Sequence, residues 1–237
     1  MAMKALVIYP TVFEAAAFFK ARAAGRPSVG AVVRGENGAV SALVSGYGCA
    51  ASMERVRRAA EDLKPDIALL CGFCGSCSPE FSRGDFLYET SNPELRGIFE
   101  SLGASPARIA TSAAFAGRAE KQRLFRAGFA AVDMEAAVFS GCFPEGRFGS
   151  FRCVSDDLNP EVPEDFFRMM IDTDTGMEKS APLAAFRLLL KNPRGFARLV
   201  RYALSSRGMM AGYSEKSLAL AEKLAAFGPV QDGAGNR

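Results

Sequence analysis

Histidine and tryptophan are both absent from the 237 residues of this chain. Without histidine, Ser-His-Asp and Cys-His catalysis, HExxH zinc sites and histidine proton shuttles are excluded. Acid–base chemistry must therefore come from carboxylates, lysine, tyrosine or cysteine. No apolar run reaches the roughly 18 residues of a membrane span. The opening stretch, MAMKALVIYP, is too short for a secretory signal and reads as a buried strand, so we expect a cytoplasmic protein.

The chain also lacks a large excess of charge of either sign. Lysine and arginine number 29 against 26 acids, a net charge of +3, which argues against a dedicated nucleic-acid binder. Hydrophobic residues make up 49% of the chain, enough for a large core. The length is ordinary for one large α/β domain. We expect a single domain over 1–237, with a basic helical C-terminal region at about 181–227.

The basic residues gather in one segment, 183–207, which contains no acid. Leucine and aromatic residues supply apolar faces between its arginines. Two interpretations stay open: a solvated helix face, or a basic amphipathic helix that contacts a membrane surface. The basic residues are Arg187, Lys191, Arg194, Arg198, Arg201 and Arg207.

Strand and helix patterns alternate through the first 160 residues. The sequence predicts strands at 4–10, 66–73, 85–90, 108–115 and 149–157, and two strands within 28–48 joined at Asn37-Gly38. It predicts helices at 11–22, with Thr11 as N-cap, and at 51–66, 93–103 and 119–128, and a strand running into a helix at 130–142. This order indicates an α/β fold with a mostly parallel sheet, whose ligands bind beyond the strands' carboxyl ends.

The segment CGFCGSCSPEFSRGD, residues 71–85, allows two interpretations. Cys71, Cys74 and Cys77 recur at every third position, a spacing that suits zinc or an iron–sulfur cluster. A closed site would need a fourth ligand from another of the cysteines. The interpretation we favour has no metal: reduced, buried cysteines around a glycine loop that lets a flat base or small anion approach the main chain.

Four segments in order resemble the nucleoside phosphorylase and nucleosidase superfamily. They are SGYGCAAS (45–52), GFCGSCSPEFSRGDF (72–86), AVDMEAA (131–137) and FRCVSDD (151–157), and the likeness covers about residues 4–160. The resemblance implies a three-layer α/β/α fold with a central mixed, mostly parallel twisted sheet. It also implies cleavage of a purine N-ribosyl bond, no cofactor, and a homo-oligomer that binds a small-molecule nucleoside.

The resemblance assigns the catalytic and ribose-binding roles to carboxylates. Asp156 would hold a proton near purine N7, although its neighbour Asp157 leaves open which carboxylate points inward. Glu135 would accept hydrogen bonds from the ribose hydroxyls, while Met134 packs under the sugar. Glu14 would activate water. Taken alone, each acid has a plainer interpretation as a helix cap or first-turn residue.

The base-binding residues follow from the same resemblance. Phe115 would stack on the base, the Ala116 backbone would read its edge, and Gly72, Phe73 and Cys74 would line the loop. Phe73 stands where many nucleosidases have serine, and Ala113 replaces a polar residue. A nucleoside-binding protein with impaired chemistry is therefore an alternative, and a cysteine-ligated metal protein is a further one.

Two features bear on the nucleophile and the substrate. Glu14 favours hydrolysis, and YPTVFEAA lacks the Gly-Asp-x-x-Arg loop of phosphorylases. Phosphate stays open as a co-substrate, because Arg22, Arg34 or Arg55 could reach an anion. The basic C-terminal part resembles the branch of hopanoid-associated phosphorylases. This likeness implies removal of adenine from a lipid-linked, adenosylhopane-like nucleoside.

Overall fold

A nine-stranded sheet forms the centre of the molecule, in a computed structural model that describes residues 3–22, 24–35, 38–158, 172, 175–177 and 181–226. The strands are β1 (Ala5–Tyr9), β2 (Val32–Arg34), β3 (Val40–Val44), β4 (Ile67–Ser76), β5 (Phe86–Thr90), β6 (Ser105–Pro106), β7 (Ile109–Thr111), β8 (Ala131–Asp133) and β9 (Phe148–Asp156). The helices are α1 (Val12–Ala21), α2 (Ala50–Leu63), α3 (Pro93–Ser101), α4 (Arg118–Arg126), α5 (Ala136–Ser140), α7 (Ala181–Lys191), α8 (Pro193–Ser205) and α9 (Arg207–Ala226).

The strand order is β2-β3-β1-β4-β9-β5-β6. The neighbours β3, β1, β4 and β9 run parallel, whereas β2 and β5 are antiparallel to their partners β3 and β9. A short extension is formed by β8, which pairs antiparallel with the end of β4 and parallel with β7. The expected mixed, mostly parallel sheet is confirmed. Its parallel strands bring the carboxyl ends of β1, β3, β4 and β9 to one edge.

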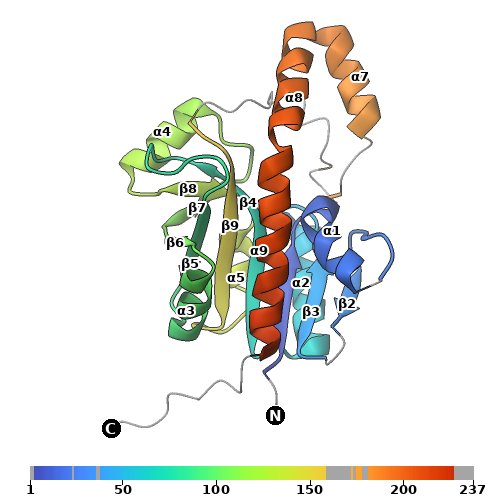
Figure 1. Ribbon diagram of the computed structural model, residues 1–237, viewed down its shortest axis with the longest axis vertical. Helices are drawn as coiled ribbons and strands as arrows, with labels where there is room; N and C mark the ends of the chain where they lie inside the picture. Colours follow the sequence, from blue (N-terminus) through green and yellow to red (C-terminus); the bar gives the residue numbers. More distant parts are fainter. Residues whose placement is uncertain are drawn as a thin grey trace.

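Helices cover both faces of this sheet, so the architecture has three layers (Figure 1). Alternate residues of β1 and β4 pack with α1, α3 and α9 in the largest core cluster. The intervening residues, among them Leu6 and Leu70, pack with α2 and α5 on the opposite face. This division follows from the two-residue period of a strand, which sends successive side chains to opposite faces. Both faces are apolar, as expected for strands of a parallel sheet.

Local signals position the start of α1. The Thr11 hydroxyl accepts from the Glu14 amide at 3.1 Å, and the Glu14 carboxylate accepts from the Thr11 amide at 2.8 Å. This reciprocal capping box satisfies two helix-end donors. The predicted N-cap is confirmed, and Glu14 is consequently fixed beside the carboxyl end of β1.

Two of the predicted boundaries are wrong. β4 runs on through Ser76, so Gly72 and Gly75 lie inside a strand and do not form a loop. β7 ends at Thr111, so Phe115 lies in the connection to α4. The first error arose because glycine normally ends a strand pattern. Here the pairing of β4 with β9 continues past both glycines, with a register shift between Cys74 and Gly75. Asn37 lies outside the described residues, while β2 and β3 do pair antiparallel.

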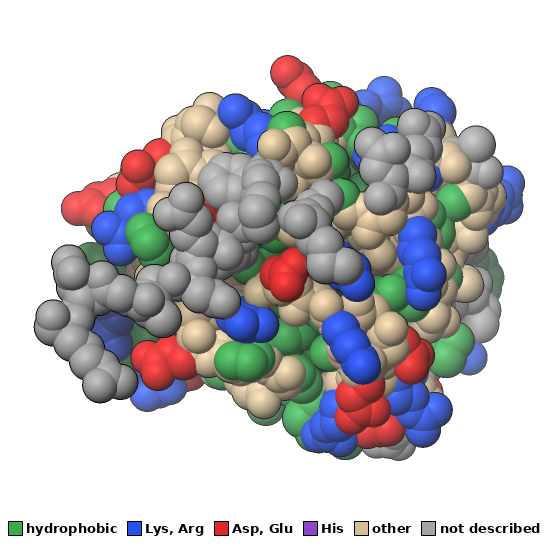
Figure 2. Space-filling model, turned by 90° about the horizontal axis from the view of Figure 1, so that it is seen from below, with side chains coloured by type: hydrophobic (Ala, Val, Ile, Leu, Met, Phe, Trp, Pro, Cys, Tyr) green, Lys and Arg blue, Asp and Glu red, His purple; other side chains and the backbone are tan. Residues whose placement is uncertain are grey.

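The helices α7 and α8 lie at the end of the molecule opposite the N-terminus, beyond the carboxyl ends of the parallel strands (Figure 1). Among the residues whose side chains the structure describes, nine large hydrophobic ones are exposed, and five of them lie on these two helices: Phe186, Leu189, Leu190, Val200 and Leu204. Acidic and basic side chains are mixed at the other end of the molecule, which Figure 2 shows. In the described part of the chain, no helix is long and apolar enough to cross a membrane.

We predict that Phe99→Ala lowers the free energy of unfolding by about 3–5 kcal/mol, the usual cost of emptying a buried aromatic site. Phe99 is fully buried, and its ring lies 5.4 Å from that of Tyr88 and 5.3 Å from that of Phe151. The control Phe125→Ala removes a ring that is 47% exposed and should cost less than about 0.5 kcal/mol. Urea denaturation measures both, and equal losses would contradict this account of the core.

Candidate active site

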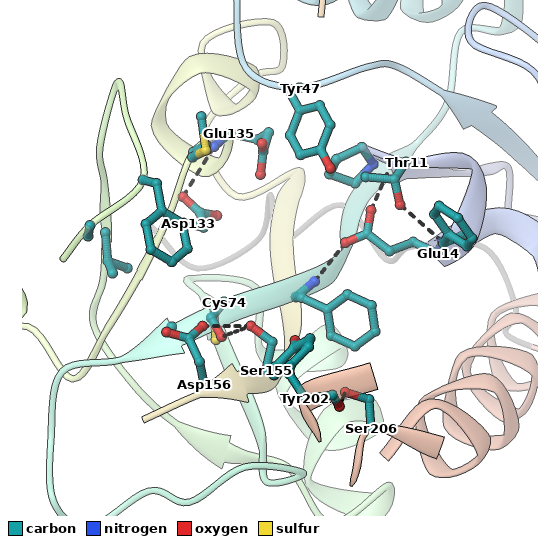
Figure 3. Close-up of a pocket in the computed structure, with 18 of the residues that line it drawn as sticks. Thr11, Glu14, Tyr47, Cys74, Asp133, Glu135, Ser155, Asp156, Tyr202 and Ser206 are labelled. Atoms are coloured by element: carbon teal, nitrogen blue, oxygen red, sulfur yellow. Dashed lines mark hydrogen bonds between the residues drawn. The ribbon is translucent and has the colours of Figure 1, made fainter. Parts of the chain in front are cut away.

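A cavity of about 500 Å³ lies at the carboxyl ends of the parallel strands. Residues far apart in the chain form its wall, including the ends of β4, β8 and β9, the start of α1, and α8. Eight of the nine predicted site residues line it: Glu14, Phe73, Cys74, Phe115, Ala116, Met134, Glu135 and Asp156. In Figure 3, Glu14, Glu135 and Asp156 approach from three sides of this cavity.

The ninth predicted residue, Gly72, lies behind the wall and does not line the cavity. A Cβ at this position would collide with Glu14 Oε1 and would lie 2.6 Å from Arg152 Nη1. Gly72 was expected to bind the base, but the structure places it beneath two charged groups. Glycine is required here because the strand backbone must let both side chains approach closely.

The Glu14 carboxylate is held at both oxygens. Oε2 accepts from the Thr11 amide in the capping box, and Oε1 accepts from the Phe73 amide of β4 at 2.8 Å. Glu14 is only 4% exposed. Burial raises the pKa of its carboxyl above the ordinary value, while Arg152 and the two amide donors partly oppose this. A carboxyl with a raised pKa, fixed in a cavity wall, is suited to accept a proton from water near neutral pH.

Met134 and Glu135 follow β8 and face the cavity beside the segment 45–49. The Gly48 amide donates to Glu135 Oε1 at 3.3 Å. A Cβ on Gly48 would overlap the Met134 carbonyl oxygen, so only glycine permits this approach. Burial raises the Glu135 pKa to about 8, with Arg152 opposing and the carboxylates of Asp133 and Glu14 adding to the rise. The segments SGYGCAAS and AVDMEAA, read separately in the sequence, are thus in direct contact.

Arg152 and Asp133 are two residues of the site for which the sequence predicted no role. Arg152 is fully buried, and its Nη2 donates to Asp133 Oδ2 at 2.5 Å and to Glu135 Oε2 at 3.1 Å. Burial lowers the Arg152 pKa, but the carboxylates of Asp133, Glu135 and Glu14 raise it more strongly, so it stays charged. The sequence does contain a signal for Arg152, which lies between apolar residues in the strand segment FRCV. A charge buried in this way requires a partner of opposite charge.

Asp133 connects this ion pair to the start of α5. Its Oδ1 accepts from the Thr111 hydroxyl at 2.9 Å and from the Glu135 amide at 3.3 Å. The Ala136 amide donates to both carboxylate oxygens at 3.2 Å. Asp133 therefore combines a helix-capping role with the neutralisation of Arg152. This double role fixes the backbone from which Glu135 projects.

Asp156 faces the cavity, whereas Asp157 is exposed. The Ser155 hydroxyl donates to Asp156 Oδ1 at 2.8 Å. The buried ammonium of Lys121, on α4, is paired with Oδ2. This lysine was not predicted from the sequence, because a basic residue on a short polar helix usually faces solvent. No local pattern marks it, and its partner is 35 positions away.

The C-terminal helices complete the wall. Leu199, Tyr202 and Ala203 of α8, together with Ser206 and Met210, line the same cavity as Phe13 and Tyr47. Arg83 anchors this region: its guanidinium donates to the Ser205 hydroxyl at 2.8 Å and lies 4.4 Å from the centre of the Tyr202 ring. Leu199, Ala203 and Met210 make the side of the cavity beneath α8 mainly apolar.

The three clustered cysteines do not face a common point. Cys71, Cys74 and Cys77 belong to three separate hydrophobic clusters, and all three are free thiols. Burial raises the pKa of the Cys74 thiol well above its ordinary value, which disfavours the thiolate form that binds metals. Among the described residues, no group of three or more cysteine or acidic side chains could hold a metal ion.

Comparisons with solved structures identify the fold. The Helicobacter pylori 5′-methylthioadenosine/S-adenosylhomocysteine nucleosidase superposes with a TM-score of 0.61 at 13% identity, covering 94% of this chain and 99% of the other. A futalosine hydrolase mutant from the same organism gives 0.60 at 13% identity, over 94% and 100%. The Colwellia psychrerythraea nucleosidase in complex with adenine gives 0.56 at 17%, over 78% and 94%.

The chain therefore has the nucleoside phosphorylase-like α/β fold that these purine nucleosidases share. No protein-family model matches the sequence, and no curated protein matches it either. The expected three-layer architecture with a mixed sheet is confirmed. At this level of identity the likeness establishes the fold, and the chemistry must be argued from the site.

We predict that the protein loses stability as the pH rises from about 5 to about 8, since folded Glu135 keeps a proton that the unfolded chain releases. The sign follows because the folded state binds more protons than the unfolded state over this interval. Glu135→Gln should make this fall smaller, while the exposed control Glu222→Gln should leave it unchanged. Urea denaturation at both pH values provides the test. An unaltered pH dependence in Glu135→Gln would show that the carboxyl is ionised in the folded protein.

Proposed function

We propose that this protein cleaves the N-ribosyl bond of a purine nucleoside of the adenine type. The observation that carries the proposal is the convergence of Glu14, Glu135 and Asp156 on one cavity that also holds Phe115. Departure of a base from ribose develops positive charge on the sugar, which nearby carboxylates stabilise. An aromatic ring beside the acids offers the base a stacking surface.

The proposed roles combine the sequence resemblance with the position of these residues in the cavity lining. Glu135 accepts hydrogen bonds from the ribose hydroxyls, and Met134 packs against the sugar. Phe115 stacks on the base, with the Ala116 backbone at its edge and Phe73 and Cys74 alongside. Asp156, at the far end of β9, faces the base nitrogen that must gain a proton as the bond breaks. Glu14 accepts a proton from the attacking water.

Water is the nucleophile that this site favours. Lys121 is the basic side chain among the described residues that line the cavity, and it is already paired with Asp156, so a phosphate dianion would lack a free cation there. Arg55, one of the arginines considered for anion binding, donates instead to the Ser45 carbonyl at 2.6 Å and the Thr175 carbonyl at 2.7 Å. Phosphorolysis is the competing reaction, and the sugar product distinguishes the two.

The apolar side of the cavity supports a 5′ substituent that is itself apolar. Phe13, Leu199 and Met210 line this side, and Phe13 is 59% exposed. A lipid-linked, adenosylhopane-like nucleoside is the most extended substrate in this class. We also propose that the enzyme is cytoplasmic and forms a homo-oligomer. Light scattering after gel filtration measures the mass of the assembly.

Nucleoside binding without turnover is the second candidate, and the pairing of Asp156 with Lys121 favours it. An aspartate that accepts from a lysine has no proton of its own to give to the base. Calorimetric binding of an adenosine analogue, without release of adenine from the matching substrate, would support this candidate. Such an outcome would replace the enzymatic proposal.

We predict that the protein releases adenine from adenosine or a 5′-alkylthioadenosine, and that the free sugar (ribose or 5-alkylthioribose), not its 1-phosphate, accumulates with or without added phosphate. Glu14→Gln should lower kcat by about 10²–10⁴-fold, the usual contribution of a positioned base. Glutamine still supports a capping box. Glu94→Gln, a matched change in the first turn of α3 and away from the cavity, should have no effect. Phosphate-dependent formation of ribose 1-phosphate would refute hydrolysis.

We also propose that α7 and α8 contact an anionic membrane surface. Exposed apolar side chains and five basic residues share these helices, and no acid lies between 181 and 214. This combination of a basic and an apolar face is typical of interfacial helices. The same helix α8 lines the cavity, so a substrate embedded in lipid would meet the enzyme next to the site.

We expect cosedimentation with vesicles rich in phosphatidylserine at low salt, lost as the salt concentration rises. Replacing Arg194, Arg198 and Arg201 with Gln should abolish binding, since each basic residue near the surface contributes about 1 kcal/mol. The control replaces Arg57, Arg58 and Arg123, three exposed arginines on α2 and α4, and should bind as before. A wild-type protein that ignores these vesicles would end the membrane proposal.

A further inference from the structure

A buried lysine stands in the cavity wall where the proposed reaction needs a proton. Lys121 is 1% exposed and lines the cavity from α4. Its ammonium is paired with Asp156 Oδ2 and donates to the Asp157 carbonyl oxygen at 2.5 Å. A buried ammonium is costly unless it is paired and hydrogen-bonded. The ion pair and the hydrogen bond therefore hold the Lys121 ammonium in a fixed position in the cavity wall.

The surrounding fold makes room for this side chain. A Cβ on Gly75 would lie 2.8 Å from both Cε and Nζ of Lys121, so a larger residue in β4 would displace the ammonium from this position. The register shift of β4 against β9 falls between Cys74 and Gly75, beside the same group. Leu124, one turn further along α4, packs in a buried cluster with Ala116 and Val132. Strand and helix thus both position Lys121.

The hydrogen bonds indicate which member of the pair carries the proton. Asp156 Oδ2 accepts from the Lys121 ammonium, while the Ser155 hydroxyl lies 2.8 Å from Oδ1 and 3.1 Å from the Cys74 carbonyl oxygen. In an ion pair of this kind the carboxylate only accepts, whereas the ammonium has three protons to donate. The acid of the pair is therefore the lysine, and the aspartate orients it.

We propose that Lys121 is the proton donor to the departing base and that Asp156 acts as its positioning partner; this assignment rests on the proposed function. As the N-ribosyl bond breaks, its electron pair goes to the base, and a Lys121 N–H proton moves to the base nitrogen, directly or through Asp156. Water adds to the ribosyl carbon and gives its proton to Glu14. That proton returns to Lys121 through solvent, so nucleoside and water become base and ribose with no net proton change.

The position of Lys121 relative to Phe115 agrees with this role. Phe115 and Ala116 immediately precede α4, so the stacking ring, the backbone that reads the base edge and the ammonium come from one short segment, 115–121. All three line the same cavity. A base stacked on Phe115 would consequently present its edge to the lysine and aspartate pair.

The test compares two leaving groups in one variant. Lys121→Met should lower kcat/KM for the adenine nucleoside by about 10²–10⁴-fold, the range for loss of a general acid. With p-nitrophenyl riboside, whose leaving group departs without a proton, the same variant should lose less than about tenfold. Lys20→Met, which removes an exposed lysine of α1, is the control and should match the wild type on both substrates.

A second variant separates charge from proton donation. Lys121→Arg keeps a cation beside Asp156, but guanidinium does not deprotonate in proteins. It should therefore be as impaired as Lys121→Met with the adenine nucleoside and close to wild type with the nitrophenyl substrate. Activity on the latter also reports that each variant is folded.

The other outcomes overturn the assignment. Equal losses on both substrates would make Lys121 a structural cation. Full activity of either variant on the adenine nucleoside would remove Lys121 from the chemistry, with the proposed function intact. A wild-type protein that releases nothing from either substrate would overturn the proposed function and the lysine's role together.

Discussion

The buried guanidinium of Arg152 is the interaction on which the rest of the site depends. It lies on a central strand, and the carboxylates of Asp133, Glu135 and Glu14 surround it. These acids come from the end of β8, the start of α5 and the first turn of α1. Bringing three carboxylates together without a cation would cost more than the fold could offset. Arg152 therefore makes an acidic cavity compatible with a stable core.

Three glycines allow the charged groups and the backbone of the site to approach one another closely. Gly72, Gly48 and Gly75 each leave space that another charged or backbone group occupies: Glu14 with Arg152, the Met134 carbonyl, and Lys121. None of these three glycines has a positive φ. Their role is close approach and not turn formation. The three glycines thus let neighbouring groups pack closely around the site.

Much of the fold could be predicted from the sequence. The alternation of strands and helices, the Thr11 cap and the strand ends that carry Glu135 and Asp156 all follow from local patterns. The extent of β4 did not, because its glycines are explained only by side chains from α1, β9 and α4. Arg152, Asp133 and Lys121 were missed for the same reason: each is defined by a partner distant in sequence, which no local period reveals. Carboxylates at strand ends can be read locally, whereas the cations that hold them cannot.

Helix α8 forms one part of the cavity wall. In α8, Leu199, Tyr202 and Ala203 face the cavity, and the neighbouring residues Val200 and Leu204 face outward. One helix thus connects the interior to an exposed apolar surface. The proposals for the 5′ substituent and for the membrane both derive from this single element.

The double use of Glu14 has a consequence for descendants of this protein. The residue closes the capping box of α1, so a lineage that stopped turning over its substrate would still retain glutamate or glutamine there to keep the helix start. Lys121 has no such capping role, and an apolar side chain could fill its space without the free-energy cost of burying a charge. In relatives that have decayed into binding proteins, the lysine should disappear while the glutamate persists, which makes position 121 the more informative marker of an active lineage.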